Sequence, residues 1–185
     1  MMSERKPVDI LRHEAGHMIV AKVLGFETLE LSYNESQAGA NLTVDPKLPD
    51  VNAVSAFIRR RAAVLYAGVL AESLKGAKVD NEQALELIRG PTASDDYSKV
   101  RELVRVLAGI ERGESKYQDV LDRVDGEVWN RAAELVEKYA PQIVMLSKHW
   151  RETLGGRSTI EISADEIRAI ECFERIRFGC ELVQV

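Results

Sequence analysis

A run of nearly apolar residues, 62–71, constrains the fold of this chain more than any other stretch. The run is too short to cross a bilayer as a helix, which takes about 20 apolar residues. Because it is apolar on almost every side, we predict that it forms the buried centre of a long helix from about Val51 to Lys75, ended by Gly76. The chain has 185 residues, of which 45% are apolar and 30% charged, so one globular domain can enclose this helix in a core.

A second long helix is expected near the start of the chain. It runs from about Pro7 to Leu24, and Gly25 supplies its C-terminal stop. Residues 28–33 then alternate like a strand, and residues 40–44 are a candidate for a second one, with turn-like residues between them. This is the one small sheet, or hairpin, that the sequence predicts.

Helical periodicity dominates the rest of the chain. Four further helical segments are expected, at residues 80–90, 92–110, 115–154 with a break at Pro141, and 163–178. Thr92 or Ser94 is expected to cap the second of these, and Ser163 with Glu166 forms a capping-box pattern at the start of the last. The prediction is therefore a mainly α fold with a small β-hairpin or sheet after the first helix.

The first helix carries an H-E-x-x-H motif, His13-Glu14-Ala15-Gly16-His17. Four residues are just over one helical turn, so both imidazoles project from one face and can share a metal ion. Imidazole suits zinc, which lowers the pKa of a bound water toward about 7, and Glu14 can take the proton and return it to a leaving amine. With three histidines in the chain, this motif arises by chance in roughly one chain in a hundred or fewer. The alternative is two packed histidines beside a surface glutamate.

A catalytic zinc site normally has a third protein ligand and one open position. No third histidine follows at a short spacing, so the candidates are carboxylates on other helices or the distant His149. A lone histidine beside Trp150 is more typical of a surface or packing residue. Glu72, on the apolar helix, is an alternative ligand, a partner that orients one histidine through its free ring nitrogen, or a solvated charge at a helix end.

Three segments resemble the FtsH-type zinc metallopeptidases in order and rough spacing. RHEAGHMIVAKVLGF resembles the zinc helix of that family, VLYAGVLAESL its buried helix, and PTASDDYSKVRELVRVL the segment with the third ligand. The resemblance covers about residues 7–170. It implies a single helical peptidase domain over residues 1–185, with a zinc-binding lobe at 1–112 and a C-terminal helical lobe at 113–185.

The resemblance also implies one zinc per chain, held by His13, His17 and Asp96, with Glu14 as the catalytic residue. Asp95 is the rival third ligand, because this chain has two acids where the family usually has one after a polar residue. The alternative role of both acids is stabilisation of a helix N-terminus, worth about 0.3–1 kcal/mol.

In the family, an edge strand near the zinc helix binds extended substrate. The matching residues here are Gly39, Ala40, Asn41 and Leu42. Strand addition would explain peptide binding that tolerates different sequences, because main-chain hydrogen bonds supply the affinity. A simple two-stranded hairpin without substrate is the alternative.

Composition and motifs bound the partners and the compartment. A net charge of −5 gives no reason to expect nucleic acid or anionic lipid. A solvated helix face is the favoured role of the basic run 59–61, and contact with a partner or an acidic group is the alternative. Two thiols, Cys172 and Cys180, and the lack of an apolar leader favour a cytoplasmic protein without direct membrane insertion. The chain has no phosphate-binding loop, so we do not expect it to unfold substrates with ATP by itself. The alternatives are action on unstructured peptides, reliance on a separate unfoldase, or a role other than general proteolysis. A separate unfoldase or a homo-oligomer is the partner that these alternatives leave open.

The leading hypothesis is a zinc-dependent metalloendopeptidase that hydrolyses unfolded or extended polypeptides. The second is a metal-binding but non-proteolytic regulatory or adaptor module with the same fold. A helical interaction domain without metal is the third.

Overall fold

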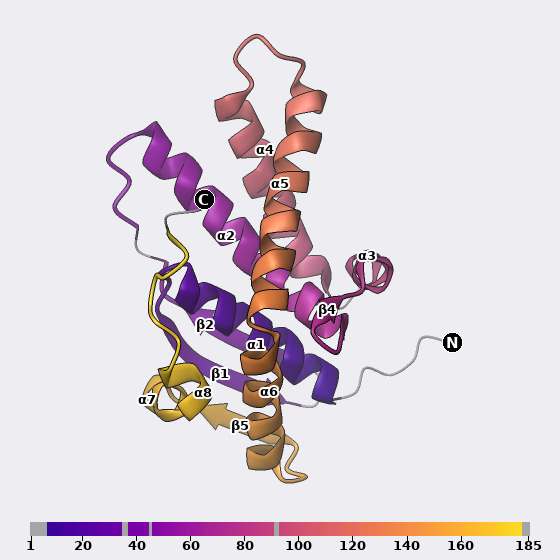
Figure 1. The fold of residues 1–185 in the computed structure, drawn as a ribbon, viewed down its shortest axis with the longest axis vertical. Helices are drawn as coiled ribbons and strands as arrows, with labels where there is room; N and C mark the ends of the chain where they lie inside the picture. The colour runs from indigo at the N-terminus through magenta and orange to yellow at the C-terminus, as the bar shows by residue number, and fades with distance from the viewer. Residues whose placement is uncertain (1–6, 35–36, 45, 91–92, 183–185) are drawn as a thin grey trace.

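The computed structural model describes residues 7–34, 37–44, 46–90 and 93–182, and it is mainly helical (Figure 1). The helices in chain order are α1 (Pro7–Val23), α2 (Val51–Glu72), α3 (Asn81–Arg89), α4 (Ser94–Glu111), α5 (Tyr117–Lys138), α6 (Ala140–Leu154), α7 (Ala164–Ala169) and α8 (Glu171–Glu174). The strands are β1 (Thr28–Asn34), β2 (Gln37–Leu42), β3 (Leu74–Lys75), β4 (Lys78–Val79) and β5 (Thr159–Ile162). The predicted fold class, mainly α with a small sheet, is confirmed.

Helices α1 and α2 form the centre of the molecule, and α1 packs against α2, α6 and β2 (Figure 1). Every residue of the apolar run 62–71 is buried, as predicted. The two helices approach closely at Gly16, where an added Cβ would lie 2.5 Å from the Ala67 carbonyl oxygen and 2.5 Å from the Ala71 Cβ. The small residue inside the H-E-x-x-H motif therefore lets the second helix come into direct contact.

The sheet has the strand order β2-β1-β5, and both pairings are antiparallel. Its inner face is apolar: Leu31 pairs with Ile162 and Tyr33 with Ile160, and all four side chains are buried. Strand β5, from the C-terminal part of the chain, was absent from the sequence prediction. The second predicted strand is displaced, since β2 covers residues 37–42 rather than 40–44. Within the described ranges, β1 is the one strand that pairs with β2, so β2 is an edge strand of this sheet.

Two predicted helix ends are wrong. Helix α2 stops at Glu72, and the next residues form the β3–β4 hairpin, in which Gly76 takes a left-handed φ of +65°. The capping box at Ser163 is confirmed, but α7 ends at Ala169 because Ile170 is extended, with φ −70° and ψ 121°. The predicted break before Pro141 is confirmed, since α5 and α6 meet at Tyr139.

The helix caps and the basic run also differ from expectation. The residue before α4 is Ala93, which provides no side-chain cap; Ser94 is already helical, and Thr92 lies outside the described residues. The expectation that residues 59–61 form a solvated helix face is wrong. Arg59 donates to Glu111 on α4 at 2.9 Å and to Glu127 on α5 at 2.8 Å, and Arg60 donates to the carbonyl just after α1 at 3.2 Å. These arginines connect helices.

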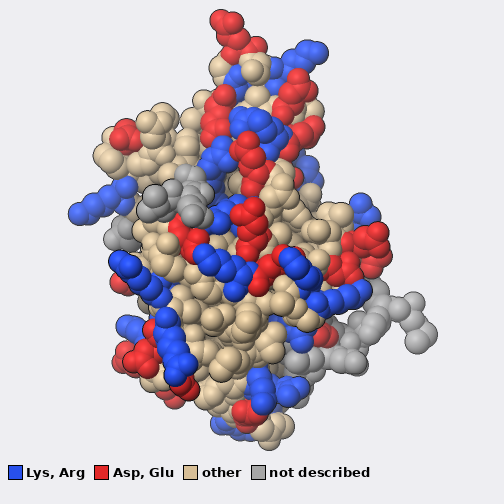
Figure 2. All heavy atoms as spheres, viewed as in Figure 1, with Lys and Arg blue, Asp and Glu red and all other residues tan. Residues whose placement is uncertain are grey.

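The surface carries charges of both signs. On the face drawn in Figure 2, lysine and arginine side chains are interspersed with aspartate and glutamate along the α4–α5 hairpin and around the sheet. Among the helices of the described ranges, none combines the length and the apolar character that a membrane crossing requires.

We predict that Gly16→Ala lowers the free energy of unfolding by about 1–3 kcal/mol, because its methyl group overlaps the α2 backbone. The matched control is Gly126→Ala on α5, where an added Cβ meets no atom within 4 Å. That substitution should raise the free energy of unfolding by about 0.5–1 kcal/mol through helix propensity. Urea unfolding of the metal-free proteins measures both, and equal stability of Gly16→Ala and wild type would contradict the close helix contact.

Candidate metal centre

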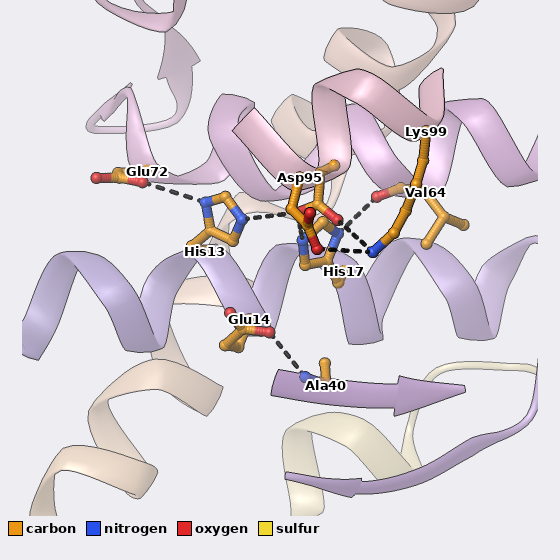
Figure 3. Close-up of polar contacts among 9 residues, drawn as sticks. His13, Glu14, His17, Ala40, Val64, Glu72, Asp95 and Lys99 are labelled. Carbon is orange, nitrogen blue, oxygen red and sulfur yellow. Dashed lines mark hydrogen bonds and ion pairs between the residues drawn. The ribbon is translucent and has the colours of Figure 1, made fainter. Parts of the chain in front are cut away.

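The two histidines of α1 project from one face of that helix toward α2 and α4 (Figure 3). They are buried, with 3% of His13 and 7% of His17 exposed, and their ring centroids are 4.7 Å apart. The rings are nearly perpendicular, at 79°. Both Nε2 atoms point to a common carboxylate oxygen, so one turn of helix does present two imidazole nitrogens to a single point.

That oxygen belongs to Asp96, in the first turn of α4. Asp96 Oδ2 lies 3.3 Å from His13 Nε2 and 3.1 Å from His17 Nε2. Burial raises the pKa of the Asp96 carboxyl, but hydrogen bonds and charge interactions with the two histidines outweigh this effect and hold that pKa below its ordinary range. Within the described part of the chain, these three residues form a group that could hold a metal ion.

Asp95 points away from this group. Its side chain is 94% exposed and pairs with Lys99 at 3.4 Å, one helical turn further along α4. Lys99 also approaches Asp96 Oδ1, at 4.0 Å. The geometry therefore favours Asp96 over Asp95 as the third ligand.

The other ring nitrogen of each histidine faces an acceptor on α2. His13 Nδ1 lies 3.1 Å from Glu72 Oε2, and His17 Nδ1 lies 2.7 Å from the Val64 carbonyl oxygen. Glu72 is itself buried, with 6% exposed, so it is not a solvated charge at a helix end. A carbonyl cannot donate, so His17 carries its proton on Nδ1, and Glu72 favours the same tautomer in His13. A carboxylate or carbonyl on the far nitrogen is the usual support of a metal-binding histidine.

When each ring carries a single proton, on Nδ1, the point between the rings is surrounded by acceptors, and the hydrogen bonds to Asp96 form only when Nε2 is protonated as well. Two Nε2 lone pairs and the Asp96 carboxylate converge there, and this arrangement requires a positive charge. An extra ring proton or a metal cation can supply it. Ligand atoms of a tetrahedral zinc with bonds of about 2.0–2.1 Å lie about 3.3 Å apart. The two nitrogen–oxygen separations, 3.1 and 3.3 Å, fit that spacing, and all three ligand atoms lie within 4.8 Å of one another.

Gly68 on α2 leaves room directly beside the two Nε2 atoms. A Cβ added there would lie 2.5 Å from Nε2 of both His13 and His17. That distance approaches a zinc–nitrogen bond, so a side chain at this position would fill the space that the two nitrogens face. The residues present therefore fit zinc, both in their donor chemistry and in the room left for the ion.

In the view of Figure 3, the Glu14 side chain extends from the lower edge of α1 toward β2, whereas the two rings extend from the upper edge. It is buried, with 7% exposed, and its Oε2 accepts a hydrogen bond of 2.8 Å from the main-chain N–H of Ala40 on β2. The other residues of the expected substrate strand lie beside it: Gly39 pairs with Ser32, and Asn41 donates to Glu30. Leu42 ends the strand.

Sequence reasoning did not single out Gly68 or Val64. A glycine inside an apolar helix lowers helix stability by about 1 kcal/mol relative to alanine. A glycine at such a position therefore indicates that another group approaches the helix closely, and this signal could have identified Gly68. Val64 contributes only its carbonyl, so its side chain gives no signal. His149, the remaining candidate, is exposed and lines an open pocket of about 870 Å³ with β5 and α7.

In comparison with known proteins, the chain matches no protein-family model and no curated protein.

We predict that Asp96→Asn lowers zinc affinity by more than the 10–100-fold expected for losing a supporting contact, because a direct ligand is weakened. Asp95→Asn, one residue away and exposed, should keep wild-type affinity. Competition titration with a chelating dye measures both, and equal loss in the two variants would argue against Asp96 as the ligand.

A second prediction concerns Gly68→Ala. The added methyl group should reduce zinc binding at least 100-fold while the helical content is kept, since it occupies the space between the Nε2 atoms. Gly109→Ala on α4, where an added Cβ meets no atom within 4 Å, is the control. Circular dichroism and zinc titration of both proteins provide the test, and a zinc-replete Gly68→Ala would exclude this position for the ion.

Proposed function

We propose that this protein is a zinc-dependent metalloendopeptidase. The observation that carries the proposal is the convergence of His13 Nε2, His17 Nε2 and Asp96 Oδ2 on one part-buried point, with room left at Gly68 beside the two Nε2 atoms. Three protein ligands leave one position of a tetrahedral zinc open, as catalytic sites do and structural sites do not. The resemblance to FtsH-type peptidases supports the same conclusion.

Each residue of the candidate centre has a separate role in the proposed reaction. His13, His17 and Asp96 hold the ion, while Glu72 and the Val64 carbonyl fix the ring orientations through the Nδ1 atoms. Zinc in such a site lowers the pKa of a bound water toward about 7 and polarises a carbonyl. Glu14, next to the first ligand, is the carboxylate that accepts a proton and returns it to the leaving nitrogen.

The substrate class is unfolded or extended polypeptide. Strand β2 supports this, because it is an edge strand that packs against α1 and contacts Glu14. An extended peptide that pairs with this edge would be held through its main chain, largely independently of its side chains.

One observation favours the second candidate, a metal-binding module without peptidase activity. The Glu14 carboxylate is engaged by Ala40 and points away from the ligand nitrogens (Figure 3). If Oε2 stays bonded to Ala40, this oxygen is not available to accept a proton at the metal.

The variant Glu14→Gln separates the two candidates. For a peptidase, we predict that it keeps one zinc per chain but hydrolyses disordered casein about 10²–10⁴-fold more slowly, because the proton acceptor is lost. His13→Ala should lose both zinc and hydrolysis. Elemental analysis and release of labelled fragments provide the measurements, and a zinc-loaded wild type without hydrolysis would favour the non-proteolytic module.

A further inference from the structure

The contact between Glu14 and Ala40 joins two groups that the proposed function needs for other purposes. Glu14 must reach the side of α1 that carries the metal ligands, and in Figure 3 its side chain points instead to β2. The Ala40 N–H donates to Glu14 Oε2 at 2.8 Å. In this conformation the Ala40 N–H and Glu14 Oε2 are bonded to each other. The N–H is therefore not available to a substrate strand, and this carboxylate oxygen is not available at the metal ligands.

The geometry of β2 shows what else this N–H can bind. Antiparallel strands direct main-chain donors to alternate edges, so Ala40 and Ala38, two residues apart, share an edge. Among the strands that the structure describes, β1 alone pairs with β2, and the Ala40 N–H bonds to Glu14, so we assign this donor to the free edge. An added peptide strand would bond to that same edge through its carbonyl oxygens.

We propose that the Ala40 N–H holds the Glu14 carboxylate in a resting position, and that a substrate strand pairing with β2 releases it. This inference rests on the proposed function and adds a regulation to it. The peptide carbonyl takes the place of the carboxylate on the Ala40 N–H. The freed carboxylate then turns toward the side of α1 that carries His13 and His17.

The replacement of Glu14 by a peptide carbonyl on the Ala40 N–H depends on the length of the peptide. A hydrogen bond to a charged carboxylate is about twice as strong as one to a neutral carbonyl, so a single peptide carbonyl cannot displace Glu14. Additional bonds along β2, at Ala38 and its neighbours, must form at the same time. Long extended peptides therefore release Glu14, and di- or tripeptides do not.

Proline substitutions on β2 test the release. Ala40→Pro removes the N–H that holds Glu14, and proline is tolerated where a strand N–H faces outward at an edge. Turnover of a chromogenic dipeptide should rise about tenfold or more, the factor that corresponds to one hydrogen bond to a charged group. Ala38→Pro, the matched control, should leave dipeptide turnover unchanged and slow the cleavage of long peptides. Unchanged or lower dipeptide turnover in Ala40→Pro would overturn the proposal.

Amide hydrogen exchange tests the contact without metal or activity. In zinc-free protein the Ala40 amide should exchange at least tenfold faster in Glu14→Ala than in wild type, and the Ala38 amide should not change. Equal Ala40 exchange in both proteins, in a wild type that cleaves long peptides, would overturn the resting contact and leave the peptidase intact. A zinc-loaded wild type that cleaves neither substrate would overturn the peptidase, and the release mechanism with it.

Discussion

The close packing of α1 on α2 determines most of the candidate centre. Gly16 lets the two helices approach until a single Cβ would not fit between them. At this separation, one face of α2 supplies the free space at Gly68, the Val64 carbonyl and the Glu72 carboxylate to the two rings of α1. A larger helix separation would remove the ring supports and the narrow space for an ion together.

The two histidines and Asp96 form a polar group beside an otherwise apolar core, and such a group has an electrostatic cost. Helix α1 is enclosed on most sides, and its histidines take the place that apolar residues occupy elsewhere along it. Lone pairs and carboxylates gathered away from water are unfavourable unless a positive charge joins them. A polar group at this place lowers the stability of the fold unless a cation joins it, and such a local departure from an apolar core is expected at functional sites.

The sequence predicted the parts of the centre that depend on one helix. The spacing of His13 and His17 fixes their common face, whatever the rest of the chain does. Asp96 was predicted as a ligand only from the family resemblance. It follows His17 by 79 residues in the chain, so its place beside His17 depends on how distant helices pack. Strand β5 was missed for a similar reason: four alternating residues between two helices become a strand only when β1 is available to pair. The end of α2 was misplaced because Gly76 stops a helix and closes a tight hairpin equally well.

The pairing of β1 with both β2 and β5 has a consequence for how the protein is made. The candidate ligands all precede position 97, whereas the third strand of the sheet begins at residue 159. During synthesis the donors leave the ribosome well before the strand that braces β1 on its second side. The three candidate ligands are therefore synthesised before the sheet that carries the β2 edge can be completed by residues 159–162.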